Sequence, residues 1–219
     1  MLFRSISDLV MATTHCGTHI DAFAHVTRGD RDEWFGGHSA NDELGDFGPR
    51  SGDASELPAI VARGVLLNIP AALRLDHCPP SHAISSRDLE AAASAGGVEL
   101  RQGDVVLVRT GQMRYWPDEE RMAAVEGAGV SIEGAEWLAA HHPLAVGSDT
   151  VQFECTPSGV DGSPQPVHIR LIQELGIPIM EWVNCEPLVQ AAVTEFAFVC
   201  LPLPIHGATG SLINPIAIV

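Results

Sequence analysis

Short apolar runs rich in Val and Ile recur from residue 61 onward and predict buried β-strands. Between them, helical patterns begin at Ser or Pro and end at Gly or before Pro, which are ordinary helix boundaries. Because strands alternate with helices, we expect an α/β fold in which residues 1–219 form a single domain. The predicted strands are 61–69, 104–110, 143–147, 177–182, 195–201 and 215–219, and the predicted helices are 85–95, 131–141, 167–175 and a short one from residue 186.

The segment 28–57 does not follow this alternation. Gly, Asp, Glu, Asn and Ser dominate it, and Trp34, Phe35 and Phe47 are interspersed. A connection of about thirty residues is long for a compact domain and is often a lid over an active site. A solvated insertion is the alternative, and the pattern favours neither over the other.

The charge balance excludes several partners and mechanisms. The formal net charge of −16 argues against binding to nucleic acid or to anionic membranes. All 12 cationic side chains are arginine, so no lysine can form a Schiff base, anchor pyridoxal phosphate or complete a P-loop. Five scattered cysteines without a CxxC pair, and an N-terminus unlike a signal peptide, predict a cytoplasmic protein with reduced thiols.

Four metal-capable side chains lie close together in the sequence: His15, His19, Asp21 and His25. Two imidazoles and a carboxylate are the ligand set of catalytic zinc, manganese or non-haem iron sites. This set leaves coordination positions open, which is typical of a catalytic site, and a metal hydroxide there is the expected nucleophile. His25, four residues past the carboxylate, is the candidate base.

The spacing of these residues predicts a bend in the chain. A helix would turn Asp21 about 200° away from His19, and a strand would spread the residues too far along its axis. Gly17 permits the bend. We therefore expect a strand end at His15, a turn at Gly17-Thr18 and a tight helical turn carrying His19 and Asp21.

Other candidates for the same site lie far along the chain. His168 begins the third predicted helix, and Glu181 ends the strand after it, at the carboxyl edge where α/β sheets collect ligands. They are candidates for a second metal position or for orienting the first ligands. The Gly-rich segment 202–211 offers His206 and backbone N–H groups, including that of Gly207, that can hold an oxyanion or carboxylate; a plain loop is the alternative.

Taken in order, these residues resemble the signature of the metal-dependent cyclase family of hydrolases. That family includes bacterial kynurenine formamidase, isatin hydrolase and a zinc-dependent trans-dienelactone hydrolase. The resemblance rests on His15-x-Gly-Thr-His-x-Asp-x-x-x-His25 and continues through 147–150, His168, 176–181 and 207–211. It implies a compact α/β domain of the swivelling β/β/α type, assembled as a homodimer or homotetramer.

The resemblance also implies roles for the individual residues. His15, His19 and Asp21 would bind a first Zn²⁺ or Mn²⁺ ion. In members with two ions, His168 and Glu181 would bind a second one that Asp21 bridges. His25 would shuttle protons beside the site.

The chain departs from the family at two places. Many relatives have Pro where this chain has Phe23, and they usually carry a Gly/Pro-rich strand and loop before the motif, whereas 14 residues precede His15 here. The N-terminus is therefore expected to be short relative to the family. The segment 34–38 is similar to a larger subgroup, which favours a substrate other than N-formylkynurenine. Trp34, Phe35 and Phe47 would form an apolar wall for it.

The sequence thus predicts a metal-dependent hydrolase that opens an amide, lactam or lactone bond of a small cyclic or aromatic substrate. A non-haem Fe(II) oxygenase shares the ligand set, and a catalytically inactive metal-binding or interaction protein is the third hypothesis. No G-x-S-x-G motif is present, which argues against a serine nucleophile. Cys16 is disfavoured as a nucleophile because the neighbouring histidines fit a metal site.

Overall fold

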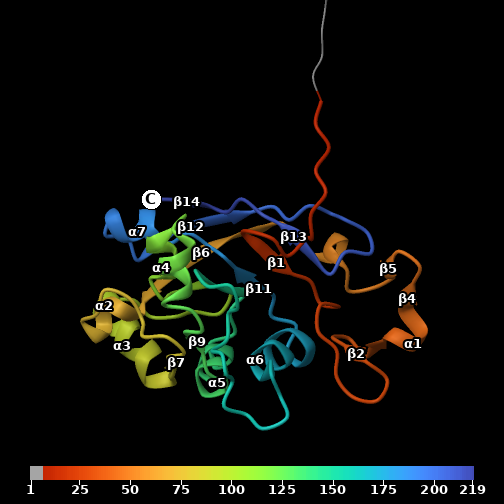
Figure 1. The fold of residues 1–219 in the computed structure, drawn as a ribbon, viewed down its shortest axis with the longest axis horizontal. Helices are drawn as coiled ribbons and strands as arrows, with labels where there is room; N and C mark the ends of the chain where they lie inside the picture. Colours follow the sequence, from red (N-terminus) through yellow and green to blue (C-terminus); the bar gives the residue numbers. More distant parts are fainter. Residues whose placement is uncertain (1–6) are drawn as a thin grey trace, which may run out of the picture.

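The computed structural model describes residues 7–219 and builds them around an eight-stranded mixed sheet (Figure 1). Its strand order is β13-β1-β11-β10-β8-β6-β12-β14. The four central strands are parallel, and the flanking pairs are antiparallel. The strands are β1 His19–Asp21, β6 Ile60–Asn68, β8 Val105–Arg109, β10 Ala145–Ser148, β11 Ile179–Glu181, β12 Glu195–Cys200, β13 Gly210–Leu212 and β14 Ile216–Ile218.

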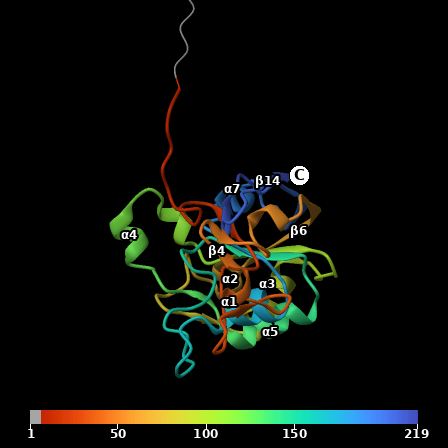
Figure 2. The same cartoon turned by 90° about the vertical axis from the view of Figure 1, so that its right-hand side faces the viewer.

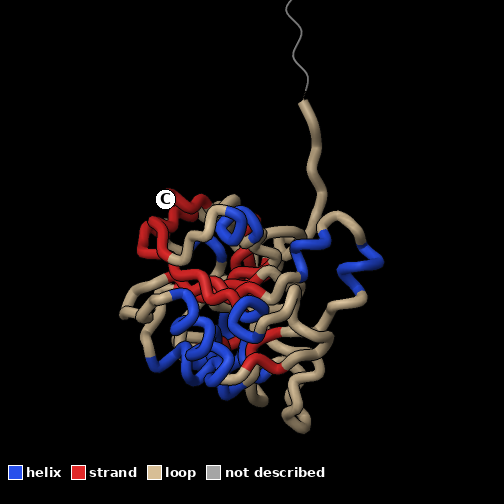
Figure 3. The backbone as a smooth tube through the Cα atoms, turned by 90° about the vertical axis from the view of Figure 1, so that its left-hand side faces the viewer, coloured by secondary structure: helices blue, strands red, loops and turns tan. Residues whose placement is uncertain are grey.

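Helices cover the two faces of this sheet unequally. The helices α3, α5 and α6 lie on one side and α7 on the other (Figures 1 and 3). The short α4 lies at the periphery, away from α3 and α5 (Figure 2). The helices are α2 Ile69–Leu73, α3 Ser86–Gly96, η2 Gln112–Tyr115, α4 Glu119–Ala123, α5 Ile132–Ala140, α6 Pro166–His168, which continues as the wider turn η3 Ile169–Glu174, and α7 Glu186–Gln190.

Two apolar cores follow from the alternation of side chains along each strand. In β8, Val106 and Val108 face the core beneath α3 and α5, whereas Val105 and Leu107 face the core that includes Leu188 of α7. A sheet buried on both faces reads as a continuous apolar run, which is why the central strands are visible in the sequence.

The predicted α/β domain is confirmed, and most element boundaries agree within two residues. The helix α3 begins as predicted, because Ser85 accepts from the N–H of Asp88 while the Asp88 carboxylate accepts from the N–H of Ser85. Gly97, with a φ of 64°, ends that helix in the left-handed region.

The predicted strand end at His15 and the predicted helical turn at His19 and Asp21 are both wrong, because His15 lies in a turn and His19–Asp21 form strand β1. This strand pairs with β11 on one side and with β13 on the other, so both of its edges have ladder partners. Long-range pairing therefore overrides the local expectation. The bend itself is confirmed: Gly17 has a φ of 60° and ends a turn that delivers the chain into β1.

The segment 28–57 folds into short elements at one side of the sheet. They are β2 Glu33–Trp34, β3 His38–Ser39, α1 Ala40–Glu43, β4 Leu44–Gly45, β5 Gly48–Pro49 and η1 Ala54–Glu56. Trp34, Asp53 and Ala54 are buried, so part of this segment packs into the domain, whereas Phe47 is exposed. A further small sheet joins β7 Ala83–Ile84 to β9 Gly129–Val130. Within residues 7–219, no helix has the length and apolar character needed to cross a membrane.

Candidate metal centre

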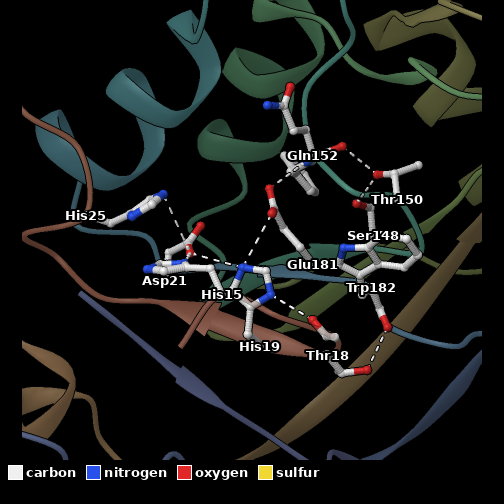
Figure 4. A network of polar contacts seen from close by, with 12 residues as sticks. His15, Thr18, His19, Asp21, His25, Ser148, Thr150, Gln152, Glu181 and Trp182 are labelled. Carbon is white, nitrogen blue, oxygen red and sulfur yellow. Dashed lines mark hydrogen bonds and ion pairs between the residues drawn. The ribbon is translucent and has the colours of Figure 1, made fainter. Parts of the chain in front are cut away.

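The site lies where β1 meets β11 (Figure 4). His19 is directly opposite Glu181 in the antiparallel register, and Ile20 is opposite Met180. Since successive side chains alternate between faces, Ile20 and Met180 join the core on one face while His19, Asp21 and Glu181 share the other. The pairing of two short strands thus places one imidazole and two carboxylates side by side.

His15 and His25 reach the same point from either end of β1. The Nδ1 atom of His15 lies 2.9 Å from Oδ1 of Asp21, and Nε2 of His25 lies 3.9 Å from the same oxygen. The two imidazole rings stack with their centroids 4.2 Å apart. Both side chains remain partly open to solvent, at 21% and 27% exposed, whereas His19 and Asp21 are buried.

His168 completes the cluster from the helix side of the sheet. Its Nε2 atom lies 3.1 Å from Oε1 of Glu181 and 3.8 Å from Oδ2 of Asp21. Two groups of potential ligand atoms result, one made by His15, His19 and Asp21 and the other by Asp21, His168 and Glu181. Asp21 belongs to both groups, which is the arrangement of a carboxylate that can bridge two ions.

The donor set fits a divalent metal ion. Imidazole and carboxylate ligands suit zinc and manganese. Within residues 7–219, Oδ2 of Asp21 is buried without a hydrogen-bond partner. A buried carboxylate oxygen in that state is costly unless a cation or donor satisfies it. The histidines and carboxylates of this cluster can therefore hold a metal.

Hydrogen bonds outside the cluster fix the orientation of the imidazoles. Nδ1 of His19 bonds the carbonyl of Gly17 at 2.8 Å, so its Nε2 atom faces Asp21 and Glu181. Nδ1 of His168 bonds Glu154, which is itself buried and also accepts from the backbone N–H of His168. Such partners set the tautomer of a ligating histidine.

The end of β11 is held in place by its neighbours. Trp182 follows Glu181 with a φ of 56°, donates its N–H to the carbonyl of Thr150 and accepts a 2.7 Å hydrogen bond from Thr18 (Figure 4). One oxygen of Glu181 accepts from the N–H of Phe153. The loop after β10 and the start of β1 therefore fix the backbone that carries Glu181.

The electrostatics separate an anionic centre from a neutral imidazole. Burial would raise the pKa of Asp21, but hydrogen bonds from His15 and His19 hold it below its usual range. Burial lowers the pKa of His25 to about 4 against the opposing attraction of Asp21. At neutral pH the Asp21 carboxylate is therefore ionised and His25 is an uncharged base.

His168 and His19 behave in the opposite sense. Burial would lower the pKa of His168, but hydrogen bonds to Glu154 and Glu181 raise it to about 10. Burial also opposes protonation of His19, but the hydrogen bond and charge of Asp21, the Gly17 carbonyl and the charge of Glu181 together raise its pKa. In the metal-free protein the His168 ring is therefore an imidazolium that faces the carboxylates of Glu154 and Glu181.

The structure brings together all six residues predicted to bind metal or carry protons and leaves the predicted substrate-binding residues elsewhere. The predicted substrate-binding residues Trp34, Phe35, His206 and Gly207 lie outside the cluster. Trp34 is 2% exposed, and the half-exposed ring of Phe35 packs on Phe23 with centroids 5.4 Å apart. His206 is exposed beside Ser55, and the N–H of Gly207 already donates to Asp53 at 2.6 Å. Their contact with substrate stays a prediction.

Sequence reasoning missed two polar residues that support the site. Glu154 lies in the loop after β10, and Thr209, which lies 2.9 Å from Nε2 of His15, immediately precedes β13. Neither lies within a recognisable ligand spacing. A signal for Thr209 existed in the Gly-rich segment 202–211, but the sequence did not show which atom it faces.

Comparisons with known proteins agree with this fold. The Cyclase family model, described as "Putative cyclase", matches residues 5–155, which is more than half of the chain. No curated protein matches. A crystal structure of a novel cyclase is similar over 99% of this chain and 73% of its own, with 25% identity and a TM-score of 0.85.

Two further structures share the fold. An isatin hydrolase bound to the product analogue thioisatinate matches 95% of this chain and 73% of its own, with 22% identity and a TM-score of 0.67. A potential metal-dependent hydrolase with cyclase activity matches 93% of this chain and 78% of its own, with 20% identity and a TM-score of 0.59. The resemblance predicted from the motif is thereby confirmed, and the chain belongs to the Cyclase family.

Proposed function

We propose that this chain is a metal-dependent hydrolase that opens an amide, lactam or lactone bond in a small cyclic or aromatic molecule. One observation carries the proposal: a single buried carboxylate, Asp21, belongs to two groups of potential ligands, and one of its oxygens has no hydrogen-bond partner within residues 7–219. The isatin hydrolase and the metal-dependent hydrolase of the same fold support the reaction class.

The ligands would divide between one or two ions of Zn²⁺ or Mn²⁺. His15, His19 and Asp21 would hold the first ion, and His168 and Glu181 would hold a second one together with Asp21. When bound, the metal would supply Lewis-acid activation of water and of the substrate carbonyl. His168, whose pKa is raised to about 10, would give up a proton to become a ligand.

His25 would be the proton carrier. Its Nε2 atom lies 3.9 Å from Asp21, its side chain is partly open to solvent, and its lowered pKa keeps it uncharged at neutral pH. A neutral imidazole can take a proton from water during attack and return it to the departing nitrogen or oxygen. Because its ring stacks on His15, it is held beside the ligands without needing to bind the ion itself.

Substrate would enter from the open side of the His15–His25 pair. The partly exposed ring of Phe35 offers an apolar surface, and the buried Trp34 supports the segment that carries it. The proposed substrate is accordingly small and cyclic or aromatic. The segment 28–57 would act as a lid, because its short hairpins contain few buried apolar side chains.

We also propose that the chain assembles as a homodimer or homotetramer. The strand β14 is the edge of the main sheet, and Ile216 and Ile218 are more than half exposed on it. An apolar edge strand with unpaired backbone groups favours association with another chain. Light scattering coupled to size exclusion tests this directly; a monomer at micromolar concentration would contradict it.

The proposed activity is tested by a hydrolysis screen of N-formylated arylamines, isatin-like lactams and lactones, with Zn²⁺, with Mn²⁺ and with a chelator. We expect metal-dependent turnover of at least one class. His19→Ala should lose the metal, whereas His25→Gln should keep it and lose about 10²- to 10⁴-fold in kcat. His141→Gln, whose ring bonds the carbonyl of Trp137 on α5, is the matched control and should change neither.

The alternatives give different results in the same experiment. Turnover that survives chelation would contradict metal dependence. Bound metal without turnover would favour the non-catalytic hypothesis. Hydrolysis under anaerobic conditions would exclude the Fe(II) oxygenase.

A further inference from the structure

His15 is held by side chains instead of by a sheet ladder. It lies in the turn before β1, and each of its ring nitrogens has one partner: Nδ1 is 2.9 Å from Oδ1 of Asp21, and Nε2 is 2.9 Å from the hydroxyl of Thr209. Thr209 is 194 residues away in the sequence and immediately precedes β13. Its position is fixed independently, because its carbonyl accepts from the N–H of Ala22 just after β1.

Gly210 makes the space in which the ring of His15 lies. In the β1–β13 register Gly210 is directly opposite Asp21, on the face that carries the ligands. A Cβ atom built on Gly210 would lie 2.6 Å from Cε1 and 3.0 Å from Nε2 of His15. The backbone of Gly210 is not in the left-handed region, so this position uses the absence of a side chain and not the freedom of glycine.

The chemistry of a ligating histidine indicates which ring nitrogen of His15 would bind a metal. An imidazole that binds a metal through one nitrogen carries its proton on the other, which donates to a fixed acceptor. Nδ1 of His15 faces Asp21, and Nε2 faces an acceptor, the Thr209 hydroxyl. His19 is reversed, since its Nδ1 faces the Gly17 carbonyl and its Nε2 faces Asp21.

We infer that Thr209 is a positioning residue that keeps the proton of His15 on Nε2 and directs Nδ1 to the ion shared with Asp21. This inference rests on the proposed metal site. A hydroxyl suits the role because it can accept from Nε2–H when the ion is bound and donate when it is not. The segment 207–210 then positions the His15 side chain: Thr209 bonds its ring, and the absence of a side chain at Gly210 leaves room for that ring.

The test compares Zn²⁺ affinity, measured by competition with a chromophoric chelator, in Thr209→Val and Thr209→Ser proteins. Valine keeps the branched shape and removes the hydroxyl, so we expect about 10- to 100-fold weaker binding. Serine keeps the hydroxyl and should restore most of the affinity. Thr194→Val, which removes a hydroxyl that bonds the Gly96 carbonyl, is the matched control and should bind as the unchanged protein does.

A second readout does not depend on any variant folding. Long-range ¹H–¹⁵N spectra of the Zn²⁺-loaded protein should show His15 with Nε2 protonated and Nδ1 coordinated, and His19 with the opposite pattern. Coordination of His15 through Nε2, or equal affinity in the valine variant, would overturn the inference while leaving the metal site intact. If the unchanged protein binds no Zn²⁺, the proposed function fails and the inference fails with it.

Discussion

Glu154 accepts two hydrogen bonds from His168, one from its backbone N–H and one from Nδ1 of its ring. The pair is buried, and the opposite ring nitrogen of His168 points at Glu181 and Asp21. Glu154 thus fixes both the backbone and the ring of a candidate ligand. A carboxylate in this position also makes the imidazole a stronger donor to a metal.

Replacing Glu154 should therefore weaken metal binding without touching a ligand. In Glu154→Gln we expect the affinity for the ion at Asp21, His168 and Glu181 to fall about 10- to 100-fold, as titration with Mn²⁺ would measure. Glu136→Gln removes an exposed partner of Arg170 and is the control. Unchanged Mn²⁺ affinity in Glu154→Gln would show that His168 does not bind the ion through the orientation described here.

Metal binding should release protons at neutral pH. The pKa of His168 is raised to about 10 by Glu154 and Glu181 against the effect of burial, so its ring is protonated in the metal-free protein. The ring must lose that proton to become a ligand, and we expect about one proton per ion at this position. Calorimetry in buffers of different ionisation enthalpy measures the number, and a binding enthalpy independent of the buffer would contradict the prediction.

His25 should make the metal-free protein less stable in acid. Burial lowers its pKa to about 4 in the folded state, below the ordinary value of 6.5, so between these pH values the unfolded chain binds a proton that the folded chain does not. Stability from this group is present above the unfolded pKa and is lost as the pH falls toward the folded one. Between pH 7 and pH 5 we expect a loss of about 1–2 kcal/mol.

The variant His25→Asn isolates that contribution. Its urea midpoint, measured with a chelator present, should fall less between pH 7 and pH 5 than that of the unchanged protein. Parallel pH dependence in the two proteins would show that His25 is not held neutral by its surroundings.

A side chain at Gly210 should displace His15. In Gly210→Ala the new Cβ would meet the His15 ring and the carbonyl of Ile20, which lies 3.0 Å from it. We expect a destabilisation of about 1–3 kcal/mol in urea unfolding together with weaker Zn²⁺ binding. Gly103→Ala is a useful comparison, since a Cβ there meets nothing within 4 Å and only its φ of 85° is unfavourable. Tight Zn²⁺ binding by Gly210→Ala would show that His15 does not need this space.

The central sheet could be predicted from the sequence because four of its strands are buried on both faces and read as continuous apolar runs. The clustering of His15, His19, Asp21 and His25 could also be predicted, because these residues lie close together in the sequence. The prediction failed at β1, a three-residue strand whose conformation depends on β11 and β13 and on no pattern of its own. The ligands had to be brought together, and a local helical turn was the wrong way to do it. Pairing of β1 with β11 and β13 does so instead.

The supporting residues Glu154 and Thr209 could not be predicted from the sequence, for a related reason. Glu154 reaches His168 from a loop held by a bridge to Val130, and Thr209 reaches His15 across almost the whole chain. Their roles depend on where the sheet order places the chain, and a single polar residue in a loop gives no periodic signal. By contrast, Glu181 was predictable, since it ends an apolar strand at the edge where ligands collect.

Metal content of the purified protein and its Asp21→Asn variant is the most direct test of the central claim, that one carboxylate organises both groups of ligands. After loading with Zn²⁺ and removal of free ion, the unchanged protein should retain one or two ions per chain, and the variant should retain almost none. Asp53→Asn is the matched control. It removes a buried carboxylate that accepts hydrogen bonds from Ser55 and Gly207, and it should leave the metal content unchanged. A variant of Asp21 that still holds the same number of ions would contradict the account.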